Sequence, residues 1–142
     1  MKLFSETSLN KIDHVGIAVL NLDIAIQKYK RLGFNYIKRE LLKNMHVEVA
    51  FFQIGESKIE LLSAIKDNGP IAKYISSKGG KGGIHHLAFN VKDIGQELER
   101  LKNSGISILN EQVQEGAGNK KIAFLHPKDT EGALIELCQQ NE

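Results

Sequence analysis

The chain has little of several features that mark specialised protein classes. Its 142 residues include no Trp, two Pro and a single Cys, and one Cys cannot form a disulfide within the chain. Nineteen basic and 17 acidic residues leave a net charge of +2, which gives no strong field toward a nucleic-acid backbone or an anionic membrane. No apolar run approaches the roughly 20 residues that span a bilayer. We therefore expect a cytoplasmic protein that binds neither nucleic acid nor membrane.

The hydrophobic residues, 42% of the chain, are enough for a folded core and argue against wholesale disorder. The length suits one compact domain or two small halves that share a core. We place a single domain at residues 11–142, after a lead-in over residues 1–10.

An internal repeat organises this domain. The stretch HVGIAVLNLDIAIQKYKRLG (14–33) aligns without a gap with HLAFNVKDIGQELERLKNSG (86–105). Each stretch reads as a short strand, a polar turn and an amphipathic helix, because the apolar residues after the turn are spaced i, i+4 and i+7. These stripe residues are Leu22, Ile26 and Tyr29 in the first copy and Ile94, Leu98 and Leu101 in the second.

Three strand-like segments follow each predicted helix. In the first half they cover residues 34–42, 46–54 and 57–64, and in the second half residues 107–115, 120–127 and 133–140. Each half therefore reads as a βαβββ module, at about 11–65 and 83–140, with a linker over 66–82 that contains a short helical segment at 71–77. The pattern predicts an α+β fold in which two tandem βαβββ modules form a cup-shaped mixed β-sheet.

Four polar residues occupy equivalent places in the two modules, on the strand faces predicted to point away from the helices. Because side chains alternate along a strand, these positions face the open side of the sheet. Burying such groups is costly unless they are paired or bind a metal, and two neutral His with two carboxylates suit Zn, Mn, Fe, Co or Ni. The alternative to a metal site is that the His residues are hydrogen-bonded and the Glu residues are ion-paired. The four residues are His14, Glu60, His86 and Glu136.

Glu48 is a fifth carboxylate of interest. It alternates with Val47 and Val49 in HVEVAFF, and we assign it with Ala50 and Phe52 to the cavity side. A carboxylate in a partly apolar cup can have a raised pKa and act as a general base. The alternative is a solvated charge on an edge strand.

The segments IDHVGIAV, GGIHHLAF, GAGNKKIAFLHPKD and LIEL resemble the vicinal oxygen chelate superfamily, which includes glyoxalase I, bleomycin-binding proteins and extradiol dioxygenases. The linker PIAKYISSKGGKGGIHH and the HVEVAFF glutamate are most similar to its methylmalonyl-CoA epimerase branch. The resemblance covers residues 11–139. It implies a glyoxalase-like fold, usually a homodimer, that binds an acyl-CoA.

This resemblance implies roles for individual residues. It places one divalent metal ion (Co, Zn, Ni or Mn) on His14, Glu60, His86 and Glu136. It implies epimerisation of (2R)- and (2S)-methylmalonyl-CoA through a metal-stabilised enolate, with Glu48 as the base and Glu136 as the second acid–base group. For the CoA phosphates we consider Lys120, Lys121, Gly116 and Gly118, against the alternative of a solvated basic loop.

Other functions stay open at this point. A lactoylglutathione lyase of the glyoxalase I type would use much the same metal site. A non-haem iron dioxygenase needs two His, one carboxylate and open positions, and Glu60 as a fourth ligand argues against it. A metal-free binding protein would generally lack the four ligands.

Overall fold

The computed structural model describes residues 8–110 and 112–142. The chain divides into two compact units. The N-terminal unit is His14–His86, and the C-terminal unit is Leu87–Glu142 together with the segment that ends at Asp13. Most of the predicted lead-in, residues 1–7, lies outside the described residues, and strand β1 (Leu9–Ala18) includes the last two residues of it. Within the described ranges, no helix has the length and hydropathy that crossing a membrane requires.

The N-terminal unit has one sheet with the strand order β2-β3-β4-β1. Strands β2–β3 and β3–β4 pair antiparallel, whereas β1 and β4 pair parallel. After β1 the elements are α1 (Leu22–Leu32), β2 (Asn35–Leu42), the 3-10 turn η2 (Lys43–Met45), β3 (Val47–Ile54), β4 (Ser57–Ala64), α2 (Pro70–Ser77) and the start of β5 (Gly83–Val91).

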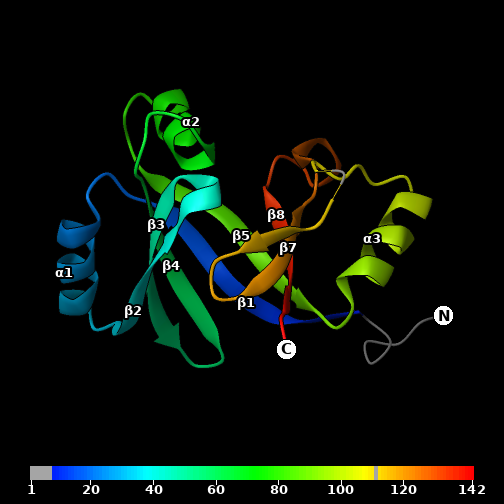
Figure 1. Cartoon of the computed structure of the whole chain (residues 1–142), viewed down its shortest axis with the longest axis horizontal. Coiled ribbons are helices and arrows are strands. Elements are labelled where there is room, and N and C mark those ends of the chain that lie inside the picture. The colour runs from blue at the N-terminus through cyan, green and yellow to red at the C-terminus, as the bar shows by residue number, and fades with distance from the viewer. Residues whose placement is uncertain (1–7, 111) are drawn as a thin grey trace. The chain divides into compact units, whose positions relative to one another are not determined.

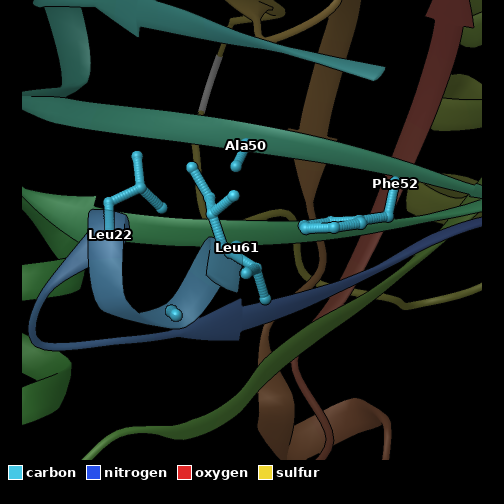
Figure 2. Packing of buried hydrophobic residues seen from close by; sticks show 6 residues of the cluster. Leu22, Ala50, Phe52 and Leu61 are labelled. Atoms are coloured by element: carbon cyan, nitrogen blue, oxygen red, sulfur yellow. The ribbon is translucent and has the colours of Figure 1, made fainter. Parts of the chain in front are cut away.

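Helix α1 covers one face of this sheet because its apolar stripe has no other place to be buried. The helix begins after Asn21, whose side chain accepts a hydrogen bond from the backbone N–H of Ile24 at 3.0 Å and so satisfies an N-terminal donor. Figure 2 shows Leu22 of the helix in one cluster with Ala50, Phe52 and Leu61 of the strands. Full burial of a Leu or Phe side chain contributes about 1.5–3 kcal/mol.

The C-terminal unit repeats this arrangement with different side chains. Its strand order is β5-β8-β7-β6, with β5 and β8 parallel and the other pairs antiparallel. Helix α3 packs on this sheet through Ile94 and Leu98, which contact Ala123, Leu125 and Leu137. Figure 1 labels α3 and the strands β7 and β8 of this unit. The elements are α3 (Ile94–Asn103), β6 (Gln114–Gly116), β7 (Lys120–Phe124), the 3-10 turn η3 (Pro127–Asp129) and β8 (Ile135–Gln140).

These elements confirm the predicted α+β fold with a βαβββ order in each half. The described residues form three α-helices and eight strands. The helical segment at 71–77 is confirmed as α2, which starts one residue earlier with Pro70, a residue suited to the first helical turn. The predicted strand 107–115 is largely wrong, because only Gln114–Gly116 forms β6. The described residues before it form only an isolated antiparallel bridge, between Ile108 and Leu125, and Ser107 N–H donates to the side chain of Asp129 at 2.7 Å.

Candidate functional site

Three of the four predicted metal ligands lie together in the N-terminal unit. His14 on β1 and His86 on β5 approach each other with their Nε2 atoms 3.1 Å apart. The other ring nitrogen of His14, Nδ1, lies 3.2 Å from Glu60 Oε2 on β4. All three side chains are buried. The parallel pairing of β1 with β4 explains the second contact, since it sets Glu60 beside Gly16, two residues along the same strand face from His14.

Gly16 makes room for His86. A Cβ atom at position 16 would lie 2.6 Å from each ring nitrogen of His86, closer than van der Waals contact allows. The sequence suggested that small residues beside His14 leave space for a ligand. In the structure, the imidazole of His86 itself occupies the space that Gly16 leaves.

Burial favours neutral imidazoles in this cluster. It is the main cause that lowers the pKa of His86 well below its ordinary value, and the neighbouring His14 and His85 lower it further. Burial alone lowers the pKa of His85 to about 4. His85 lies beside His86, with their Nδ1 atoms 2.8 Å apart. Neutral imidazoles present lone pairs, which is the state that metal binding requires.

The geometry of His14 and His86 fits a shared cation. Two nitrogens that are each about 2.1 Å from one ion in a tetrahedral or octahedral site lie about 3.0–3.4 Å apart. The observed 3.1 Å between the Nε2 atoms falls in that range. Glu60 contacts the opposite nitrogen of His14, the position of an outer partner that orients a ligand rather than of a ligand itself. Glu60 was predicted to be a metal ligand, whereas in this structure its carboxylate contacts the ring of His14 on the side away from His86.

The fourth predicted residue, Glu136, lies in the C-terminal unit. It is buried on β8, beside Ala88 of β5 in the parallel register. Its neighbour Leu137 packs under α3, so Glu136 points to the other face of its sheet, as predicted. The Cys138 thiol shares that face, and its pKa is raised by burial and, to a lesser extent, by Asp13 and Glu136.

The predicted face of Glu48 was wrong. Ala50 and Phe52, which share its phase on β3, pack under α1, so Glu48 faces the helix side rather than the face of Glu60. Arg39 confirms this placement, because it donates to both Glu48 oxygens at 3.0 and 3.2 Å and also binds Asp23 of α1. Glu48 is thus an ion-pair partner between strand and helix, and the structure gives no support to its predicted role as the base.

The four residues considered for CoA binding have different settings. Lys120 was considered for contact with the CoA phosphates, with a solvated loop as the alternative, but it is buried on β7 in an ion pair with Asp13. Lys121 is exposed on the same strand. Gly116 is buried, and a Cβ there would lie 2.7 Å from Ile122, so close packing explains this glycine. Gly118 is in the β6–β7 turn, where its carbonyl accepts a hydrogen bond from Gln140 at 3.1 Å.

The contacts of two residues, Asp13 and His85, were not predicted from the sequence. Asp13 forms a buried ion pair with Lys120, and His85 contacts the ring of His86. A signal was present in the repeat, because Asp13 and His85 occupy the same aligned position, directly before His14 and His86.

Comparisons with known proteins agree with this fold. Human mitochondrial methylmalonyl-CoA epimerase is 38% identical over 133 residues, which cover 93% of this chain and 75% of that protein. The crystal structure of methylmalonyl-CoA epimerase from Mycobacterium tuberculosis is 31% identical, with a TM-score of 0.91 over 99% of this chain and 94% of that one. A Streptomyces coelicolor epimerase variant in complex with 2-nitronate-propionyl-CoA is 31% identical, with a TM-score of 0.88 over 95% of this chain and 100% of that one.

The family assignment rests on most of the chain. Residues 13–124, from the start of the first His motif to the end of β7, match the family described as the glyoxalase/bleomycin resistance protein/dioxygenase superfamily. This chain, with its duplicated βαβββ module, belongs to the glyoxalase/bleomycin resistance protein/dioxygenase superfamily.

Proposed function

We propose that the protein epimerises methylmalonyl-CoA with the help of one divalent cation bound by His14, His86 and Glu136. The observation that carries this proposal is the pair of buried Nε2 atoms 3.1 Å apart, in a chain whose similar proteins include named methylmalonyl-CoA epimerases. Glu136 is included because the resemblance to the epimerases places a ligand there, and because it is buried on the sheet face opposite to α3. Co, Zn, Ni and Mn all suit such His and carboxylate donors.

Three protein ligands leave room for substrate oxygens. Epimerisation removes the proton from the carbon between a carboxylate and a thioester, and negative charge then develops on the thioester oxygen. When bound, the cation supplies a positive charge that stabilises this oxygen. His14 and His86 contribute neutral imidazoles, and Glu60 holds the ring of His14 through Nδ1.

The chain must also move a proton. We assign both proton transfers to Glu136, whose carboxylate is buried on the face opposite to α3. The carboxylate accepts the α-proton, the acid so formed exchanges its proton with solvent, and it then returns a proton to the other face of the planar enolate. Glu48 is not part of this step, because Arg39 holds it on the α1 side of β3. Lys121 stays a prediction for contact with the CoA phosphates, as do the homodimer and the cytoplasmic location.

Deuterium exchange tests this function directly. The metal-reconstituted protein is incubated with (2S)- or (2R)-methylmalonyl-CoA in deuterated water, and α-deuterium uptake and configuration are followed together. We expect uptake with inversion in the wild type, loss of inversion in Glu136→Gln, and wild-type behaviour in Glu48→Gln. The Glu48 variant is the matched control, since it removes a carboxylate charge from the opposite sheet face.

Two results would contradict the proposal. A wild-type protein that binds its cation but exchanges no deuterium is not this epimerase, and a thiol–aldehyde adduct would then be the next substrate to try. Loss of exchange in Glu48→Gln, with the fold intact, would restore Glu48 as the base.

A further inference from the structure

The side chain of His85 contacts His86, one of the two histidines that we propose to bind the metal. Its Nδ1 lies 2.8 Å from Nδ1 of His86, and the two rings meet nearly at right angles, with centroids 5.1 Å apart and an interplanar angle of 88°. The Nε2 atom of His86 points instead to His14. Both nitrogens of His86 thus have a defined neighbour, and the proposed cation side and the His85 side are different edges of the ring.

We propose that His85 is a positioning residue that shares one proton with His86 Nδ1 and so holds the Nε2 atom of His86 toward His14. This inference rests on the proposed function. With a cation on Nε2, His86 carries its proton on Nδ1 and donates it to Nδ1 of His85, whose own proton then sits on Nε2. An imidazole has one donor and one acceptor, so the same pair can also bond in the opposite direction before the cation arrives.

Helix α2 fixes the ring of His85. The Tyr74 ring packs edge-on against His85, with centroids 5.1 Å apart. The Tyr74 hydroxyl donates a hydrogen bond to the carbonyl of Ile84 at 2.9 Å. This bond ties Tyr74 to β5 at the residue before His85, so the aromatic ring that contacts His85 is itself held in place.

The two metal-binding histidines therefore have different partners. His14 Nδ1 meets the carboxylate of Glu60, whereas His86 Nδ1 meets a neutral imidazole. A carboxylate can only accept, and it makes the donor ring more basic. His85 exerts a weaker electrostatic effect and acts mainly by fixing the orientation of the ring.

Two variants separate positioning from packing. His85→Phe keeps an aromatic ring beside Tyr74 but has no atom that can share the proton. His85→Asn keeps a polar group near the Nδ1 position. Removing such an outer partner typically weakens metal affinity 10–100-fold, so we expect that loss for Zn²⁺ in His85→Phe and a change of less than about threefold in His85→Asn. Affinity is measured by competition with a chelator, and thermal unfolding of each variant verifies its fold.

Nitrogen-15 NMR of the imidazole rings gives a readout that does not depend on activity. In the Zn²⁺-loaded wild type we expect the proton of His86 on Nδ1 and that of His85 on Nε2. Wild-type affinity in His85→Phe, or equal losses in both variants, would overturn the inference. So would a spectrum in which neither Nδ1 carries a proton.

The same spectra distinguish this inference from the proposed function. If the wild type binds no Zn²⁺, the metal proposal fails. The metal-free spectrum still decides the hydrogen bond, because one of the two Nδ1 atoms must carry the shared proton if His85 holds His86.

Discussion

Equivalent strand registers allow the N-terminal unit to be compared with the C-terminal unit position by position. Ala50 pairs with Leu61 on β3 and β4, and Ala123 pairs with Leu137 on β7 and β8. Both pairs lie under the helix of their unit. One residue before these leucines, Glu60 and Glu136 occupy the same position on the opposite face. The shared topology therefore places core and site residues alike in both units.

The difference lies in the side chains that fill these positions. The N-terminal core contains an aromatic cluster. The ring centroid of Phe52 lies 5.5–6.5 Å from those of Tyr29, Phe34 and Tyr36. The C-terminal core has Leu125 at the position of Phe52. Val47 is a buried apolar residue, whereas its counterpart Lys120 forms a buried ion pair with Asp13. One topology thus supports different polar chemistry in each half.

Substitution of Glu136 and of Glu60 should give the largest difference between the two units. We expect Glu136→Ala to abolish one-to-one cation binding and to lower epimerisation by at least about 100-fold, because it removes a ligand near the reacting oxygen. Glu60→Ala should weaken cation affinity about 10–100-fold, because it removes only the partner of His14. Chelator competition and deuterium exchange measure both effects. Equal losses in the two variants would make Glu60 a ligand and the two positions chemically equivalent.

The buried ion pair comes next in size. Lys120→Met leaves the Asp13 carboxylate buried without its cation, and such a loss typically costs 3–5 kcal/mol of unfolding free energy. The double variant Lys120→Met/Asp13→Leu should recover most of this, because it removes both charges and makes the position as apolar as Val47. Urea unfolding monitored by circular dichroism compares the two. A single variant as stable as the wild type would show that the charge pair contributes nothing.

Acid should affect the N-terminal unit through its buried histidines. Unfolded His takes up a proton below pH 6.5, whereas folded His85 does so only near its pKa of about 4. Stability is therefore fully present above pH 6.5 and is lost as the pH falls toward 4. For the metal-free protein, His85 alone should lower the unfolding free energy by about 2 kcal/mol between pH 7.5 and 5. Urea unfolding at both pH values should show a smaller decrease in His85→Phe, and an equal decrease would rule out this contribution.

Glu48 should give the smallest effect. Its ion pair with Arg39 is partly exposed, with side-chain exposures of 31% and 36%, and such pairs contribute about 0–1 kcal/mol. We expect Glu48→Gln to lower the unfolding free energy by less than about 1 kcal/mol. Its counterpart Lys121, exposed on β7, serves as the control, and Lys121→Gln should be neutral. A loss of several kcal/mol in Glu48→Gln would show that the pair with Arg39 is essential to α1 docking.

The sequence predicts which sheet face a side chain points to only where the strand has one apolar face and one polar face. The phases of His14 and Glu136 could be predicted because apolar residues alternate with small or polar ones around them. On β3 the residues Val47, Val49, Ala50, Phe51 and Phe52 are all buried. Alternation there does not reveal which face meets α1, so the prediction for Glu48 failed.

Long-range partners were equally hard to predict. Lys120 and Lys121 are adjacent and chemically identical in the sequence, and only one of them is buried. The difference comes from Asp13, 107 residues away, which no local pattern identifies. The repeat did identify His86 rather than His85 as the equivalent of His14, because an aligned position carries more information than a pair of neighbouring histidines.

Gly16 limits how this duplicated architecture can be recombined. The aligned residue in the second copy is Ala88, so a designer who replaced residues 12–19 with residues 84–91 would introduce a methyl group at position 16. That methyl carbon would lie 2.6 Å from both nitrogens of the opposing imidazole. The two aligned segments can therefore not be exchanged freely, because the close contact at Gly16 makes the first segment specific to its place.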